Sequence, residues 1–281
     1  MSDINKEQPS IASDARFIGG RELVKNGSDD AIEMFALLLK ECKHKYGDSN
    51  IETAPCYYEY GNALFRAANR RLMDDYTNKS PEKIKEDTKH SSSDKKVLVA
   101  TTSSSRNKLH SKNDEKDDIQ LALELMENAW SILDQYQNTK PIKQWVQNQI
   151  PRYLIGIGEV LSVLKRHADS ADVYTRALPY REMPIKNASK DDKSIEHLRN
   201  RRLCAEVNVL IAEELLLCDE DEDVVTVETG SVLVKKEERV EFITGYYQKA
   251  RDELQEIGEF FFSGRGNIHE LSSLFDGTDS W

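Results

Sequence analysis

Cysteine and histidine, the residues that most often bind metals or act as nucleophiles and bases, form no recognisable site in this sequence. The four cysteines include no CxxC pair, and no histidine lies at zinc-ligand spacing from any of them. The sequence also lacks a P-loop, a GxSxG or HExxH motif and a glycine-rich dinucleotide fingerprint. We therefore expect a protein that is not an enzyme and needs no cofactor or metal. The cysteines are expected to be small core residues in a reducing compartment, at Cys42, Cys56, Cys204 and Cys218.

Carboxylates and aromatic residues at helical spacing offer a different chemistry, which is the binding of a partner. The carboxylates would pair with Arg or Lys, and Tyr58 and Phe65 would be apolar anchors, which suits a basic amphipathic helix. Phe65 is equally compatible with a place in the core. The candidate partner-binding residues are Tyr58, Glu59, Asn62, Phe65, Arg152, Ile155, Glu159, Glu206, Val209 and Glu213.

An acidic run follows the last of these helical stretches. It offers a second contact for a basic partner, and the alternative is an ordinary solvated loop. Its residues are Asp219, Glu220, Asp221, Glu222 and Asp223.

The composition limits the class of protein and the class of partner. The chain has 281 residues, of which 38% are hydrophobic and 32% charged, and its formal net charge is -11. A helical solenoid accommodates such a polar composition because its surface is large relative to its core. The negative charge disfavours direct binding of nucleic acid and favours a basic protein partner. The polar N-terminus and the lack of a long apolar run predict a soluble intracellular protein without a membrane span.

Small and aromatic residues at repeating offsets indicate the elements that must position these side chains. A tetratricopeptide unit pairs two antiparallel helices over roughly 34 residues. Small residues are needed where the helices cross, and an aromatic residue fills the space between units. We expect an all-α solenoid of four such helix pairs, at about 15–45, 54–138, 151–184 and 195–257. The small and aromatic positions are filled by Gly19, Ala31 and Phe35; by Gly61, Ala122, Met126 and Ala129; by Gly158, Ser170, Tyr174 and Ala177; and by Ala212, Tyr247 and Ala250.

Other segments interrupt or flank the predicted units. Residues 1–14 are expected to be disordered, and so is an insertion at 74–116, which is rich in Ser, Lys, Asp and Thr and poor in aromatic residues. Pro179 and Pro184 are expected to end the second helix of the third unit. A β-like stretch, VVTVETGSVLV, is compatible with a hairpin or with a loop. The segment 258–281 is expected to cap the end of the solenoid.

The predicted units resemble those of the nuclear autoantigenic sperm protein family of histone chaperones, which are SHNi-type tetratricopeptide proteins. The first unit opens with GRELVKNGSDDAIEMF, and the second opens with APCYYEYGNALFRAA, close to the family pattern AP-x-Y-x-x-YG-x-AL. The second unit is then interrupted, as it is in the family. LALELMENAWSIL after the interruption and GEVLSVLKRHADSADVYTRAL in the third unit are also similar. The resemblance covers about 15–257.

Membership of this family would imply a chaperone of core histones, chiefly the histone three–four pair, that serves histone storage, transport and nucleosome assembly. It would also imply a nuclear protein that shuttles with the cytoplasm, contacts the type B histone acetyltransferase complex and other assembly factors, and self-associates as a homodimer. One feature departs from the family. Its interruption is typically strongly acidic, whereas here lysines balance the carboxylates. The expected histone contacts therefore lie in an acidic concave groove and in the acidic run.

A general adaptor or scaffold, which binds another protein's basic helix or its C-terminal peptide, is the alternative function. Adaptors of this kind clamp a C-terminal carboxylate with Lys, Arg and Asn side chains on the concave face. Asn62 and Arg152 would suit such a clamp, but Glu159 and Glu206 would repel the carboxylate. The clamp is therefore predicted to be absent.

Overall fold

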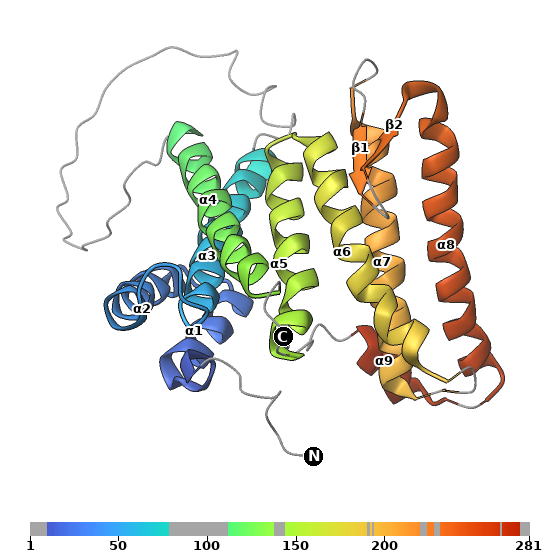
Figure 1. Ribbon diagram of the computed structural model, residues 1–281, viewed down its shortest axis with the longest axis horizontal. Helices are drawn as coiled ribbons and strands as arrows, with labels where there is room; N and C mark the ends of the chain where they lie inside the picture. The colour runs from blue at the N-terminus through green and yellow to red at the C-terminus, as the bar shows by residue number, and fades with distance from the viewer. Residues whose placement is uncertain are drawn as a thin grey trace, which may run out of the picture.

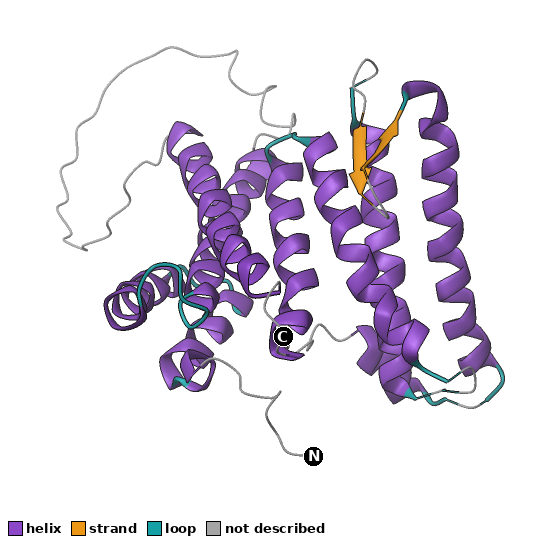
Figure 2. Cartoon of the chain, in the orientation of Figure 1, coloured by secondary structure: helices purple, strands orange, loops and turns teal. Residues whose placement is uncertain are grey.

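The computed structural model describes residues 10–78, 112–137, 144–189, 192, 194–219, 224–227, 231–264 and 266–275. These residues form a mainly helical chain with one short β-hairpin (Figures 1 and 2). In chain order the elements are η1 (Ser10–Ser13), α1 (Ala15–Lys25), α2 (Asp30–Tyr46), α3 (Ala54–Asn78), α4 (Lys112–Gln137), α5 (Gln144–Val163), α6 (His167–Asn187), α7 (Ile195–Leu217), β1 (Val224–Val227), β2 (Ser231–Val234), α8 (Lys236–Phe262) and α9 (Ile268–Phe275).

Each helix from α1 to α8 packs against the next one in the chain. In Figure 1, α5, α6, α7 and α8 lie side by side, and α1 to α4 form the other half of the array. One hydrophobic cluster runs through α1 to α6, and a second joins α6, α7 and α8 around Tyr174, Ile211 and Tyr246. This sequential packing is compatible with a helical solenoid.

Helix α2 shows why these segments fold as they do. Its buried residues recur at helical spacing, so that one face of the helix is apolar. Its first turn carries Asp30 and Glu33 and its last turn carries three basic residues, an arrangement that complements the helix dipole. The buried face consists of Ala31, Phe35, Leu38, Leu39 and Cys42.

Two glycines allow helices to cross closely, at positions that the repeat pattern predicts. A Cβ atom on Gly61 would lie 2.8 Å from the Ala122 carbonyl oxygen of α4. A Cβ atom on Gly158 would collide with the ring of Tyr174 in α6. The Ser170 hydroxyl of α6 also donates a hydrogen bond of 2.9 Å to the Gly158 carbonyl. The predicted small positions Gly61 and Gly158 are therefore confirmed as close crossings.

We expect Gly158→Ala and Gly19→Ala to change stability in opposite directions. Alanine at position 158 meets the Tyr174 ring and should lower the free energy of unfolding by about 1–3 kcal/mol. Alanine at position 19 meets no atom within 4 Å and should raise it by roughly 0.5–1 kcal/mol, because alanine favours a helix over glycine. Urea denaturation of both variants measures the difference. A stabilised Gly158→Ala protein would contradict the close crossing.

In two helices the predicted packing position is wrong by one residue. In α1, Gly20 rather than Gly19 faces Phe35, with 2.7 Å between a Cβ placed on Gly20 and the ring. In α8, Tyr246 is 2% exposed while the predicted Tyr247 is 40% exposed. Neighbouring residues point about 100° apart around a helix, so a shift of one position separates a buried from an exposed side chain. Each of these two positions has a neighbour of the same residue type, so the sequence cannot indicate which of the two residues is buried. The packing of the helices decides it.

The predicted helix stop at Pro179 and Pro184 is also wrong, because α6 continues through both residues to Asn187. Both prolines lie on the exposed side of α6, where water can bind the carbonyl groups that lose a helical N–H partner. The buried Leu178 and Arg181 keep the same turns packed against the core. Burial on the inner face thus outweighs the two lost hydrogen bonds.

Residues 10–14, expected to belong to a disordered terminus, are folded. Ile11 is buried in the first cluster, and the Ser10 backbone N–H donates to Glu52 at 2.6 Å. Asp14 then caps α1 by accepting a hydrogen bond from the backbone N–H of Arg16. One buried isoleucine in a polar stretch is a weak sequence signal, and the groups around it lie far along the chain, in α2 and in the loop before α3.

The remaining predicted segments fall partly outside the described residues. Those outside are residues 1–9, residues 79–111 of the predicted insertion and residues 276–281 of the predicted cap. The two ends of the insertion, 74–78 and 112–116, were also expected to be disordered, but they are helical and belong to α3 and α4. The β-like stretch forms a hairpin, with β1 antiparallel to β2 and Val224 opposite Val234. β1 lies against α6. At the end of the array Phe260 packs with α7 and α9 residues in a third cluster, whereas Phe262 is exposed.

Candidate functional site

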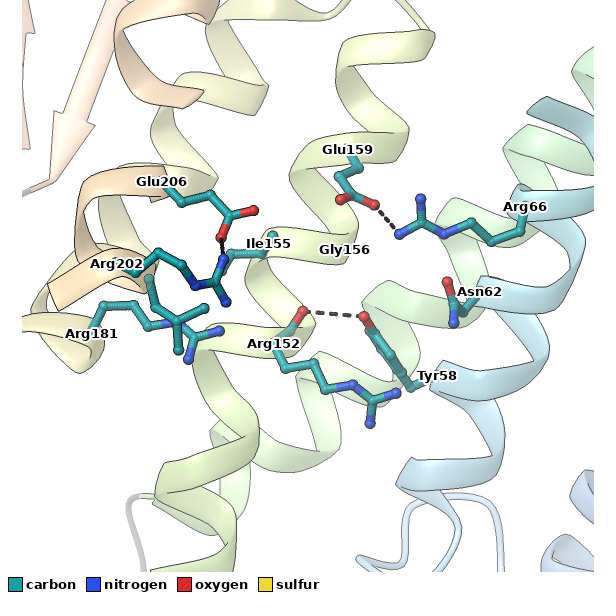
Figure 3. Close-up of a pocket in the computed structure, with 11 residues that line it drawn as sticks. Tyr58, Asn62, Arg66, Arg152, Ile155, Gly156, Glu159, Arg181, Arg202 and Glu206 are labelled. Carbon is teal, nitrogen blue, oxygen red and sulfur yellow. Dashed lines mark hydrogen bonds and ion pairs between the residues drawn. The ribbon is translucent and has the colours of Figure 1, made fainter. Parts of the chain in front are cut away.

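A pocket of about 300 Å³ opens between α3, α5, α6 and α7 (Figure 3). Residues of α3 face residues of α7 across it, and α5 lies between them. On α3, α5 and α7 most lining residues recur at intervals of three or four, so each of these helices presents one face to the pocket, and α6 contributes one residue. The lining consists of Tyr58, Asn62 and Arg66 of α3; Arg152, Ile155, Gly156 and Glu159 of α5; Arg181 of α6; and Arg202, Leu203 and Glu206 of α7.

Tyr58 is fixed in one orientation by contacts on both sides of its ring. It stacks on Tyr153 with ring centroids 4.2 Å apart, and the Arg152 guanidinium lies 4.6 Å from its centroid. Its hydroxyl donates a 3.2 Å hydrogen bond to the Arg152 carbonyl. Gly156 leaves room for this hydroxyl, since a Cβ there would collide with it. Burial raises the pKa of Tyr58 to about 12, so the phenol stays neutral and can serve as a rigid wall of the pocket.

Glu59 does not line the pocket. From the core it holds Arg152, which does line the pocket, in place. Its side chain is 2% exposed and forms ion pairs with Arg152 and, at 3.3 Å, with Arg21. Burial disfavours the charged form of Arg152, yet the attraction of Glu59 outweighs it and raises the pKa of Arg152. Burial and the neighbouring charge of Arg152 lower the pKa of Arg21. The carboxylate is thus the shared counter-ion of two arginines from different helices.

The two carboxylates that line the pocket are already paired with arginines of the same chain. Glu159 of α5 binds Arg66 of α3 at 2.7 Å, and Glu206 binds Arg202 within α7 at 3.3 Å. Burial raises the pKa of Glu159, and the charge of Arg66 opposes this rise. The lining holds four arginines against two glutamates. The expected acidic groove is therefore not found at this pocket, whose charges are mixed.

The other predicted binding residues lie elsewhere. Phe65 is buried in the main cluster, in accord with its alternative place in the core. Val209 is half-buried and Glu213 exposed on α7, and neither lines the pocket. Asp219 is exposed at the end of α7, and the rest of the acidic run, 220–223, lies outside the described residues.

Sequence reasoning missed three of the pocket's arginines. Arg66 lies two turns after Tyr58 on the same face of α3, and Arg202 lies one turn before Glu206, so extending each predicted face by a turn would have found them. Arg181 comes from α6, the second helix of a pair, whose residues were expected only to pack. No spacing rule within one helix indicates that α6 reaches the pocket.

No family model matches the sequence, and no curated protein matches it significantly. Among the residues that the structure describes, no three or more His, Cys, Asp or Glu side chains come together as a metal site. None of the described helices is both long and apolar enough to cross a bilayer.

The arrangement suits recognition of a polar, amphipathic segment. Tyr58 and Ile155 offer apolar surface, and the paired charges around them offer hydrogen-bond donors and acceptors of both signs. Exposed ion pairs contribute only about 0–1 kcal/mol. A partner's charges can therefore replace Arg66 or Glu159 in their pair at little cost.

Proposed function

We propose that the helix pairs are tetratricopeptide units and that the chain is a histone chaperone, which binds the histone three–four pair in the pocket between α3, α5, α6 and α7. One observation carries this proposal. Six of the predicted partner-binding residues, which belong to three different helices, line a single pocket, as expected for a shared concave binding face. These converging residues are Tyr58, Asn62, Arg152, Ile155, Glu159 and Glu206.

The lining of the pocket favours a helical segment that carries charges of both signs. Arg or Lys of such a segment would pair with Glu159 and Glu206, and its carboxylates would pair with the pocket arginines. Its apolar face would rest on Tyr58 and Ile155. The mixed lining changes the expected mode of binding from simple charge attraction to an exchange of ion pairs.

The net charge of -11 acts on the partner at longer range. It attracts a basic histone pair, raises the association rate and makes binding sensitive to salt. Shielding and delivering histones requires binding but no catalysis. On this proposal the protein works in the nucleus, in histone storage and nucleosome assembly, alongside the type B histone acetyltransferase complex and other assembly factors.

Size-exclusion chromatography tests the proposal directly. At moderate salt the chain and the purified histone three–four pair should elute together as one complex. Basic proteins of similar size and charge that lack the histone fold serve as controls and should elute separately. Separate elution of the histone pair, or equal retention of every basic protein, would rule out a specific histone chaperone.

An adaptor that binds a partner's C-terminal carboxylate is the second candidate, favoured by the four arginines of the lining. Repulsion by Glu159 and Glu206 was one of the reasons to expect no carboxylate clamp, but each of these glutamates is paired with a neighbouring arginine. Fluorescence anisotropy with a labelled acidic peptide separates the two candidates. Binding that disappears when the peptide's C-terminus is amidated would support the adaptor, and no binding of either peptide would exclude it.

A further inference from the structure

Two cysteines from different helices meet in the core near the N-terminal end of the array. The Sγ atoms of Cys42 in α2 and Cys56 in α3 lie 3.6 Å apart, and both side chains are free thiols. Both were expected to be small core residues, and both are buried. Their contact across two helices is a feature that the spacing of 14 residues does not predict. Cys204 and Cys218 lie in the separate cluster around α7.

One of the two thiols is within reach of solvent. Cys42 lines a cavity of about 310 Å³, whose wall also includes Ser10, Asp14, Arg16 and Lys45. Cys42 is 3% exposed, and Cys56 behind it is 0% exposed. An oxidant about as small as water can therefore meet Cys42 first, and the sulfur of Cys56 is the next group inward.

The surroundings also distinguish the two thiols. The hydrogen bond with Cys56 lowers the pKa of Cys42 against the opposing effect of burial, and Lys45 lowers it further. Glu52 and Glu41 act in the opposite direction. The hydrogen bond with Cys42 and burial raise the pKa of Cys56. Cys42 is the thiol of the pair that lines the cavity, and a lowered pKa favours the thiolate, which is the reactive form of cysteine.

We propose that Cys42 and Cys56 are a reversible oxidation site that hydrogen peroxide converts into a disulfide between α2 and α3. The Cys42 sulfur attacks one peroxide oxygen, the O–O bond breaks, and the second oxygen leaves as water with the thiol proton. Cys42 is then a sulfenic acid. The Cys56 sulfur attacks the Cys42 sulfur, the S–O bond breaks, and the hydroxyl leaves as a second water with the Cys56 proton. Two thiols are oxidised by two electrons, and one peroxide is reduced to two waters.

The geometry requires only a small movement for the second step. The sulfurs must close from 3.6 Å to a bond of about 2.05 Å. The bond would join the first helix pair to the helix that begins the second, α3, which also carries Tyr58. Disulfides of intracellular proteins are typically transient and redox-sensing. The site would thus connect oxidation to the packing of the helix that lines the pocket.

Peptide mapping of the oxidised full-length chain tests this site. The reduced, folded chain is treated with an equimolar amount of hydrogen peroxide, then alkylated in denaturant and digested without reductant. We expect a peptide pair linked through Cys42 and Cys56, lighter by two hydrogen atoms than the two free peptides, and reversal by dithiothreitol. Cys204 and Cys218 are internal controls and should be alkylated. Free thiols at positions 42 and 56, or oxidation equal to that of the controls, would overturn the proposal.

Two variants check the order of the steps. Cys56→Ser should stop at the sulfenic acid of Cys42, which dimedone captures, and Cys42→Ser should leave Cys56 as a thiol. Labelling of Cys56 by dimedone in the Cys42→Ser chain would contradict the assignment of Cys42 as nucleophile. The readout involves no histone, so its result is independent of the proposed function.

Discussion

Replacing Glu59 by alanine is expected to lower the free energy of unfolding by about 3–5 kcal/mol, because it leaves a buried charge without its counter-ion. The Glu59 carboxylate bridges Arg152 and Arg21, whose side chains are 13% and 23% exposed. Without it the two guanidinium groups repel each other across a poorly hydrated space. The packing of the pocket lining should weaken as well, because Arg152 also lies over the ring of Tyr58.

Urea denaturation followed by circular dichroism measures this effect, and Glu22→Ala is the matched control. Glu22 is an exposed glutamate that pairs with Lys25 at 3.1 Å, so its loss should cost at most about 1 kcal/mol. The double variant Glu59→Met with Arg152→Met should recover much of the lost stability, because it removes Glu59 and the more buried of its two arginines and leaves only the more exposed Arg21 without a counter-ion. If Glu59→Ala cost no more than Glu22→Ala, the buried pair would not hold the helices together.

The sequence predicts the helices well because their signals are local. The apolar face of α2 and the small residues Gly61 and Gly158 could be recognised from spacing alone, and the structure confirms their packing. The errors occur where tertiary contacts decide between local alternatives. Gly19 and Gly20 are chemically identical, and only the position of Phe35 chooses between them. Pro179 is tolerated inside α6 because the opposite face of that helix is buried.

The pocket was predictable in its outline but not in its charge. Helical spacing indicated Tyr58, Ile155 and Glu159 as residues of one face, and these do line one pocket. Spacing could not reveal that Arg66 of α3 reaches Glu159 of α5, because that pair joins residues 93 positions apart. Nor could it reveal that Glu59 points into the core. Ion-pair partners depend on how helices are placed side by side, which a single helix does not encode.

Reversing the charge of Glu159 should have a large effect on histone binding. Glu159→Lys removes a carboxylate from the pocket lining, where we propose that the partner binds, and adds a fifth cation next to Arg66. We expect the affinity for the histone three–four pair to fall by roughly 30- to 900-fold, or about 2–4 kcal/mol. An acidic C-terminal peptide would instead bind more tightly, since the added lysine attracts it. The sign of the change therefore separates the two candidate functions.

Glu213→Lys is the matched control, because it makes the same charge change on an exposed part of α7 outside the pocket. It reports the long-range effect of net charge alone and should change the affinity by no more than about threefold. Glu206→Lys, at a more exposed position of the lining, provides a second pocket variant if Glu159→Lys disturbs the fold. Circular dichroism should show the same helix content in all variants.

The affinity of these chains for the purified histone three–four pair, measured by fluorescence titration at one fixed moderate salt concentration, tests the central claim most directly. We predict tight binding by the native chain and by Glu213→Lys, and strongly weakened binding by Glu159→Lys and Glu206→Lys. Equal affinity of all four folded chains, or tighter binding by the pocket variants, would contradict the assignment of this pocket to histone binding.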